Sequence, residues 1–296
     1  MLRDRCSIPV QVKEGTRTNG GIKRIEDIVG TNPYVQAIEA EKCQNILQTE
    51  TAEVFRVTLN SGHYSRGDKN HKFMVFENGN LVERRLMDLK KGDVVFRKLG
   101  SDFVYLHKKD DCGNTFDEKK AELLGFMHGD GAFHKGEFKN HNKMWQLYTR
   151  EGEGYYVELF KELCGFDKEP TLIYDSEKTE GVKVYLSCKS VDIKKFYNDD
   201  LCLTICDKLR VPEIVFKSPQ SVMRAYLRGV FQADGWSNDD CIGLTSISKQ
   251  FVDDIAILLS FLGYDCSILK NRYFDRNPNE GHKVSYQVTI RKYFLE

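Results

Sequence analysis

Two aspartates, each followed by a glycine, have the residue type and spacing best suited to chemistry in this chain. Asp130 and Asp234 occupy the same place in two matching segments, Leu123–Gly131 and Leu227–Gly235. Both segments read apolar-x-Gly-apolar-apolar-x-small-Asp-Gly. Two carboxylates brought side by side can hold Mg²⁺, with waters and phosphate oxygens completing the coordination shell. The pair therefore predicts a divalent-metal site made by two separate parts of the chain.

Each segment is expected to form a helix that ends on its aspartate. Gly125 and Gly129 are four positions apart and share one helical face, and so do Gly229 and Ala233. Two faces without bulky side chains allow two helices to approach backbone against backbone. The pattern predicts that these two helices pack together and bring the aspartates to one seam.

The end of each helix supports a bound cation. A carboxylate in the last turn opposes the negative end of the helix dipole, and a cation would offset that cost. Gly131 and Gly235 are predicted to adopt the left-handed conformation that closes a helix. The alternative is that each Asp-Gly pair is only a helix-ending turn. Two copies at matching positions favour the metal site.

Composition describes the background of this site. The chain has 296 residues, of which 41% are hydrophobic and 30% charged, which is typical of a soluble globular protein of two domains. No apolar run is long enough for a membrane span and the start lacks a signal peptide, so an intracellular location is expected. Lys+Arg and Asp+Glu both number 44, so any binding of nucleic acid depends on where charges lie.

The first 100 residues are predicted to form a mostly β domain. Apolar and β-branched runs predict strands, and Asn78-Gly79 is a strong hairpin signal. The expected strands are Val54–Leu59, Phe73–Phe76 and Leu89–Phe96. Residues 101–118 are polar and are expected to be a linker.

From residue 119 onward the chain repeats one succession of elements, in about residues 119–200 and 220–296. A strand follows each Asp-Gly, and an amphipathic helix follows the strand. The strands are Met144–Thr149 and Ile242–Thr245, and the helices carry Tyr156 to Leu163 and Phe251 to Leu262.

Each repeat then has a late strand in strict alternation, residues 182–189 and 283–291. Alternation predicts an antiparallel sheet with one apolar face on helices and one polar face in solvent. The polar residues can hydrogen-bond base edges and phosphates, so we expect a DNA-contacting face, with a merely solvated face as the alternative. Its members are Lys183, Tyr185, Ser187 and Lys189 in the first repeat, and Lys283, Ser285, Gln287, Thr289 and Arg291 in the second.

The two motifs resemble the paired motifs of the LAGLIDADG homing endonucleases in their single-chain form. The resemblance implies an α+β fold with two pseudo-symmetric αββαββ(α) repeats and saddle-shaped antiparallel sheets, preceded by the mostly β domain. It also implies a monomer that cuts both strands of a long, specific DNA duplex in the cytoplasm of a bacterial, archaeal or phage-infected cell.

Site residues follow from the same resemblance. Asp130 and Asp234, with Gly129 and Ala233 before them, are expected to hold Mg²⁺ or Mn²⁺, and Ca²⁺ is expected to bind without supporting cleavage. Catalytic lysines are expected at Lys208 and Lys292. In relatives one such lysine lies three residues before a proline; here Leu209 stands at that place before Pro212, and Lys208 or Arg210 is the substitute.

The N-terminal part resembles the opening blocks of an intein's splicing (Hint) domain. The matching pieces are Cys6, Arg24–Gly30, His71–Phe73 and Leu86–Val94, and Asp68 stands where the block has a threonine. The closing blocks with their terminal His-Asn are missing, so the chain is not expected to splice by itself. Two alternatives to a working endonuclease stay open. One is an intein fragment that needs a C-terminal partner, and the other is a catalytically degenerate protein that only binds DNA or RNA.

Overall fold

The structure is a computed structural model, and it describes thirteen stretches of the chain. They are residues 15–18, 21–24, 28–36, 39–44, 46, 53–103, 115–134, 144–149, 152–164, 173–174, 184–188, 209–274 and 282–292. The chain forms two compact units. One unit comprises Met1–Leu106 with Ser237–Glu296, and the other comprises His107–Trp236. Within the described stretches, no helix combines the length and the apolar character that crossing a membrane requires.

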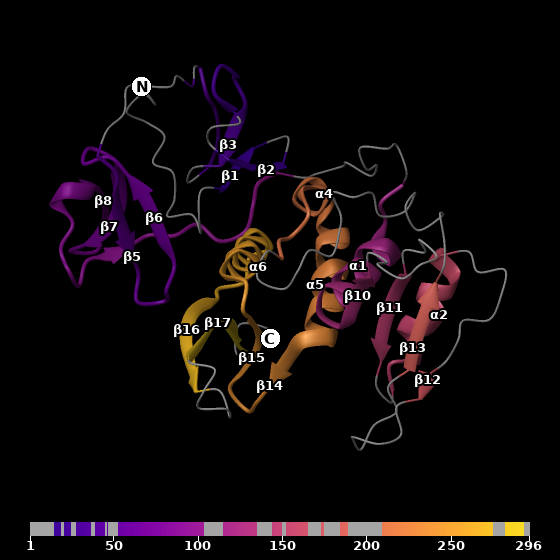
Figure 1. The fold of residues 1–296 in the computed structure, drawn as a ribbon. Helices are drawn as coiled ribbons and strands as arrows, with labels where there is room; N and C mark the ends of the chain where they lie inside the picture. Colours follow the sequence, from indigo (N-terminus) through magenta and orange to yellow (C-terminus); the bar gives the residue numbers. More distant parts are fainter. Residues whose placement is uncertain are drawn as a thin grey trace. The chain divides into compact units, whose positions relative to one another are not determined.

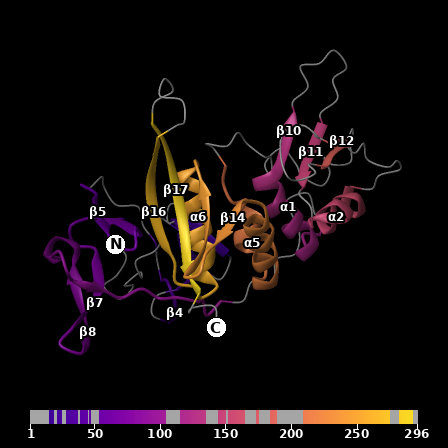
Figure 2. The same cartoon turned by 90° about the horizontal axis from the view of Figure 1, so that it is seen from below.

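The unit of residues 107–236 contains the first repeat and the helix that opens the second. Strands β10 and β11 follow α1, and β12 and β13 follow α2; the sheet order is β10-β11-β13-β12 with antiparallel pairs throughout. Helices α1 and α5 lie side by side in this unit (Figures 1 and 2). The elements are α1 (Glu118–Asp130), β10 (Gly131–His134), β11 (Met144–Thr149), α2 (Gly154–Cys164), β12 (Ile173–Tyr174), β13 (Val184–Cys188), α4 (Glu213–Lys217) and α5 (Gln220–Asp234).

Local sequence explains where these helices begin and what they cover. The carboxylate of Asp117 accepts a hydrogen bond from the backbone N–H of Lys120 at 3.0 Å and so caps α1. Helix α2 is amphipathic, as predicted, and buries Tyr156, Leu159 and Phe160. The ring of Tyr156 stacks on Phe126 of α1 with ring centroids 3.9 Å apart, so α2 packs directly on α1.

The second repeat continues with the same succession of elements. Its strands are β14 (Gly235–Ser237), β15 (Cys241–Ser246), β16 (Ser267–Phe274) and β17 (His282–Arg291), and its sheet order, β14-β15-β17-β16, is that of the first repeat. Helix α6 (Lys249–Phe261) packs on β15, β16 and β17 (Figure 2). The Ser248 hydroxyl caps it, and Gly263, with φ +97°, follows its end. The order α-β-β-α-β-β therefore occurs twice, and the predicted α+β class is confirmed.

The described N-terminal residues form small antiparallel sheets, which confirms the predicted mostly β character. Asn78 and Gly79 have φ of 48° and 84° and join Glu77 to Asn80, so the predicted Asn-Gly hairpin is also confirmed. The sheets are β2-β1-β3-β4, β5-β6 and β8-β7-β9. Their strands are β1 (Gly15–Thr18), β2 (Gly21–Arg24), β3 (Tyr34–Gln36), β4 (Ala40–Lys42), β5 (Phe55–Thr58), β6 (Tyr64–Gly67), β7 (Lys72–Glu77), β8 (Asn80–Arg85) and β9 (Val94–Val95).

The turn before β6 docks on the second repeat. The backbone N–H of Ile268 donates to the carbonyl oxygen of Ser61 at 2.7 Å, and a ring nitrogen of the buried His63 lies 2.7 Å from the carbonyl oxygen of Cys266. Burial, with Arg97 nearby, lowers the pKa of His63 to about 3. These contacts explain why the second repeat forms one unit with the N-terminal strands. The predicted ranges 1–100, 101–118 and 119–296 follow the order of motifs along the chain, whereas the contacts separate most of the second repeat from the first.

Candidate functional site

The seam between α1 and α5 is as close as the small residues predicted. A methyl group on Gly125 would lie 2.1 Å from the carbonyl oxygen of Tyr226, and one on Gly229 would lie 2.0 Å from that of Glu122. Both distances are far inside van der Waals contact. Only glycine at these two positions permits the observed approach.

These two contacts are reciprocal. Gly125 and Gly229 are equivalent positions of the two motifs, and Glu122 and Tyr226 are equivalent by the same spacing of 104 residues. Each glycine contacts the equivalent carbonyl of the other helix. A reciprocal pair of this kind is the signature of a local twofold relation, here within one chain.

Asp130 and Asp234 meet at the C-terminal end of this seam, as predicted. Each is the last residue of its helix. A methyl group on Gly129 would lie 2.5 Å from the Ala233 Cβ and 3.0 Å from the Asp234 Oδ2. The Asp234 carboxylate therefore lies against the backbone that leads into Asp130. Asp130 is half-buried with its Oδ2 shielded from solvent, and Asp234 is exposed.

The glycines after the aspartates correct one prediction. Gly131 and Gly235 have φ of −102° and −74°, which is extended backbone and not the left-handed conformation. Their role is a close approach, because a methyl group would lie 2.4 Å from the Met127 carbonyl oxygen and 2.1 Å from that of Phe231. The physical reason is that β10 and β14 begin at these glycines, so the chain leaves each helix directly as a strand.

The two carboxylates fit a hard divalent cation. Carboxylate oxygens are the ligands that Mg²⁺, Mn²⁺ and Ca²⁺ take, and both groups lie at helix C-termini, whose dipoles favour a positive charge. Among the described residues, no three His, Cys, Asp or Glu side chains gather into a complete metal cage. The pair would hold an ion whose remaining ligands are waters and phosphate oxygens, with Gly129 and Ala233 in contact beside it.

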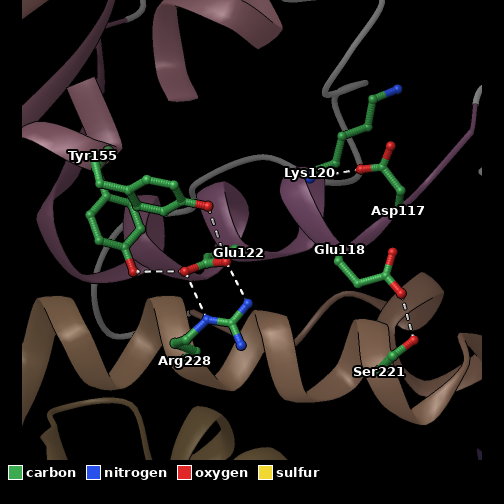
Figure 3. Close-up of polar contacts among 8 residues, drawn as sticks. Asp117, Glu118, Lys120, Glu122, Tyr155, Ser221 and Arg228 are labelled. Carbon is green, nitrogen blue, oxygen red and sulfur yellow. Dashed lines mark hydrogen bonds and ion pairs between the residues drawn. The ribbon is translucent and has the colours of Figure 1, made fainter. Parts of the chain in front are cut away.

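A buried carboxylate that the sequence did not single out lies further back on the seam. Glu122 of α1 has a side chain only 6% exposed, and Arg228 of α5 binds it with two nearly parallel hydrogen bonds of 2.9 and 2.6 Å (Figure 3). The Tyr156 and Tyr155 hydroxyls of α2 donate to the same carboxylate at 3.2 and 3.5 Å. Burial and the neighbouring carboxylate raise the pKa of Tyr156, and hydrogen bonding to Glu122 raises the pKa of Arg228. The sequence did hold one sign of this buried carboxylate, because Glu122 is the only acidic residue in the otherwise apolar run of residues 121–127.

A second polar link crosses the seam at His128. Its Nδ1 lies 2.7 Å from the Tyr226 hydroxyl, and complete burial lowers the pKa of His128 to about 3. The imidazole is therefore neutral and held between the helices. This geometry gives His128 a structural place in the seam.

The structure does not test the two predicted catalytic lysines. Lys208 lies outside the described residues. Leu209 is 7% exposed and belongs to the core, whereas Arg210 is exposed. Lys292 is half-buried and its backbone N–H donates to the Asp240 carbonyl oxygen at 2.9 Å, but it belongs to the other compact unit. Both lysine roles stay predictions.

The predicted DNA-contacting face is described in part. On β17, Gln287 donates to the Thr245 hydroxyl of β15 at 3.1 Å, Thr289 is half-buried and Arg291 is exposed. Ser285 is only 4% exposed, so its expected solvent exposure is wrong. It lies opposite Asn271 of β16, in a strand with a neighbouring strand on either side. Tyr185, Ser187 and Lys283 occupy strand positions as expected, and Lys183 and Lys189 lie outside the described residues.

The splicing-like residues are described only at His71. Its ring meets Phe73 edge-on with centroids 5.1 Å apart, and its backbone N–H donates to the Asp68 carbonyl oxygen at 3.2 Å. Burial lowers the pKa of His71, although Asp68 acts in the opposite direction. Cys6 lies outside the described residues.

Comparison with protein families now decides the class. Residues 221–295, from the start of α5 to the end of β17, match the family of LAGLIDADG-like domains. This part of the chain is a LAGLIDADG-like domain. The matched region contains Asp234 and the whole second sheet, and the first repeat repeats its order of elements.

Curated relatives of this chain are much longer proteins with different activities. A ribonucleoside-diphosphate reductase NrdEB subunit alpha of Bacillus subtilis is 25% identical over 240 residues, which is 76% of this chain and 21% of the reductase. A glutamine–fructose-6-phosphate aminotransferase of Methanocaldococcus jannaschii is 27% identical over 55% of the chain and 14% of its own length. A DNA polymerase of Thermococcus sp. (strain GE8) is 36% identical over 53% of the chain and 9% of the polymerase. The chain thus spans about a fifth or less of these relatives.

Similar solved structures include homing endonucleases. Variants of I-DmoI match 58% of this chain and 88% of their own at 14% identity, with a TM-score of 0.41. I-DmoI in complex with DNA and Mn gives a TM-score of 0.38 at 15% identity, covering 58% of this chain and 89% of its own. I-WcaI bound to its DNA recognition sequence gives 0.34 at 17% identity, covering 61% of this chain and 78% of its own.

Proposed function

We propose that this protein is a site-specific endonuclease that makes a double-strand break in a long DNA target by divalent-metal-dependent hydrolysis of phosphodiester bonds. The observation that carries the proposal is the meeting of Asp130 and Asp234 at the end of a reciprocal helix seam in a LAGLIDADG chain. A protein that only binds DNA has no need of two carboxylates at this place, because phosphates repel them.

The seam geometry suits cutting of two strands by one monomer. The two backbones of a DNA duplex are related by local twofold axes, and the α1–α5 contacts are reciprocal in the same sense. Each aspartate would then serve one scissile phosphate. Bound Mg²⁺ or Mn²⁺ would lower the pKa of the attacking water and offset charge on the leaving oxygen. Asp130 and Asp234 would hold the ions, and Lys208 and Lys292 would organise the water or offset charge beside them.

Sequence recognition would come from the polar faces of the two sheets, one in each repeat. We assign base-edge and phosphate contacts to Lys183, Tyr185, Ser187 and Lys189 on the strand of the first repeat, and to Lys283, Gln287, Thr289 and Arg291 on β17. Arg291 is exposed at the end of its strand, which suits a phosphate contact.

We also propose that the endonuclease is an inserted, intein-associated element. Between about half and three quarters of this chain matches a reductase, an aminotransferase and a polymerase, and the match covers a small share of each relative. A segment shared by proteins of unrelated activity is what an insertion into different host genes produces. The N-terminal Hint-like strands support a splicing origin.

Cleavage of a randomised duplex library tests the proposal. The full chain would be incubated with the library in Mg²⁺, in Mn²⁺ and in Ca²⁺, and the new ends sequenced, with Asp130→Asn and Asp234→Asn beside it. We expect one long site cut on both strands in Mg²⁺ and Mn²⁺, binding without cutting in Ca²⁺, and at least about 10³-fold slower cutting by each variant. Asp88→Asn, an exposed aspartate on the N-terminal part, is the matched control and should cut normally.

Two results would replace the proposal. Salt-sensitive binding to one site without cutting in any metal would indicate a degenerate, DNA-binding protein. Unchanged cutting by both aspartate variants would remove the carboxylates from their assigned role and leave the nuclease activity to be explained by other residues.

A further inference from the structure

Side-chain links of Glu118, Glu122 and His128 join α1 to α5, and these links do not follow the twofold relation of the seam. Glu118 accepts a hydrogen bond from Ser221 at 2.6 Å at the exposed start of the helices. Glu122 pairs with Arg228, and His128 with Tyr226. By the spacing of 104 residues, Arg228 corresponds to Leu124, so the ion pair occurs on one side of the seam only.

The backbone contacts of the seam only weakly oppose a slide of one helix along the other. Glycine and alanine faces are flat, and ridges that would lock into grooves are absent where Gly125, Gly129 and Gly229 touch the other helix. A slide of one helix along the other by one residue moves its aspartate by about 1.5 Å. Two carboxylates that serve neighbouring metal ions tolerate little of such movement, because coordination distances are fixed to a few tenths of an ångström.

We propose that the Glu122–Arg228 ion pair is the positioning element that sets the register of α1 on α5, and thereby the placement of Asp130 against Asp234. This inference rests on the proposed endonuclease function. A bidentate guanidinium–carboxylate pair is planar and fixes both translation and rotation of its two partners. The other two links are single hydrogen bonds, which restrain one distance each.

Burial makes this ion pair selective for one register. The Glu122 side chain is 6% exposed, so a slide that breaks its pair with Arg228 (Figure 3) leaves a nearly buried carboxylate without its guanidinium. The Tyr155 and Tyr156 hydroxyls hold the same carboxylate from α2, so the first repeat's own helix fixes where the charge lies. Arg228 is 59% exposed, and its guanidinium pairs with the Glu122 carboxylate where α1 and α2 hold it. The pair thereby fixes the position of α5.

The test compares four variants of the full chain. Arg228→Lys keeps the positive charge but loses the fork, Glu122→Gln keeps the shape but loses the charge, and Glu122→Gln/Arg228→Lys combines both. Ser221→Ala removes the exposed link and is the matched control. Each is measured for the Mg²⁺ concentration that gives half-maximal cleavage, for the ratio of nicked to doubly cut product, and for target binding in Ca²⁺.

We expect Arg228→Lys and Glu122→Gln to bind the target as the parent does, to need at least 5-fold more Mg²⁺, and to accumulate nicked DNA. The double variant should be no worse than either single one, because both remove the same pair. Ser221→Ala should stay within 2-fold of the parent in every measurement. Variants that are less stable but keep the parent's Mg²⁺ dependence and nicked fraction would show a merely structural pair and overturn the inference.

A readout without cleavage separates this inference from the proposed function. Amide hydrogen exchange of the full chain reports the N–H groups of Gly131 and Gly235, which donate to the Met127 and Phe231 carbonyls beside the aspartates. Loss of register should deprotect these two amides at least 10-fold while the inner turns of α1 and α5 stay protected. If the parent never cuts DNA but this local loss occurs, the function fails and the positioning role holds. If the loss spreads evenly over both helices, the positioning role fails.

Discussion

Helices α1 and α5 are alike in their backbones and different in their side chains. Each presents small residues to the other and ends on an aspartate, and their closest contacts are reciprocal. Yet Glu122 of α1 corresponds to Tyr226 of α5, and His128 corresponds to Gln232. The duplicated features are those that fix the approach of the helices and the carboxylates. The features that differ are those that decide how one helix is held on the other.

The same contrast separates the two aspartates. Asp130 is half-buried with one oxygen shielded from solvent, whereas Asp234 is exposed. Equal positions in the motif therefore have unequal surroundings in the fold. In the proposed reaction this difference would make the two strands unequal in rate, and nicked DNA should appear as an intermediate.

The reciprocal glycine contacts of the seam would be disrupted by adding one methyl group to either helix. Gly125→Ala and Gly229→Ala should each lower the free energy of unfolding by about 3 kcal/mol, because the new Cβ meets a backbone carbonyl that only a shift of the whole helix can relieve. Urea denaturation measures the loss. Equal losses at the two positions would support the reciprocal seam.

The control for these variants is Gly154→Ala at the start of α2, where a methyl group meets nothing within 4 Å. It should leave stability unchanged or raise it by about 0.5 kcal/mol. A loss confined to one of the two seam glycines would contradict the reciprocal contacts.

The side-chain differences between the helices are tested by replacing His128 of α1 with glutamine, the residue that α5 has at the equivalent position, Gln232. The pKa of His128 is lowered from about 6.5 to about 3 by burial, so between these values the unfolded chain binds a proton that the folded chain does not. Stability should thus be unaffected above pH 6.5 and fall as the pH falls, by about 1.4 kcal/mol per pH unit from this group. The His128→Gln variant should therefore lose about 3 kcal/mol less free energy of unfolding than the parent when the pH falls from 6.5 to 4.

Urea unfolding at pH 7 and at pH 4 measures this difference. His63, whose pKa is also lowered to about 3, contributes the same acid sensitivity in both proteins and cancels in the comparison. Parallel pH profiles for the parent and His128→Gln would show that His128 is protonated without cost, and would contradict its buried place in the seam.

The smallest expected effect is on DNA binding, and it should differ between an exposed and a buried residue of β17. Arg291→Ala should weaken binding of the target by about 1 kcal/mol and lower the salt dependence of binding by about one phosphate contact. Ser285→Ala should change neither, because that side chain is covered. Binding in Ca²⁺ at several salt concentrations measures both. A larger effect of Ser285→Ala would restore it to the DNA-contacting face.

Periodicity and turn chemistry predicted much of this fold. The Asn78-Gly79 hairpin, the helices that end at Asp130 and Asp234, and the helix that buries Phe160 were all visible, because each depends on neighbours within a few residues. The left-handed ends at Gly131 and Gly235 were wrong for a reason outside the motif: the following strands begin at once. The burial of Ser285 depends on a neighbouring strand, which alternation along one strand does not report.

By itself, the sequence determined which residues would matter at the seam: the repeated glycines, the paired aspartates and the succession of elements that carries them. Only the tertiary structure decided which residues hold the seam in register. Glu122 and Arg228 are 106 positions apart, and no local rule pairs an acidic residue inside an apolar run with one particular arginine. Burial creates that pairing, because a carboxylate closed off from water requires a partner that only the fold can bring to it.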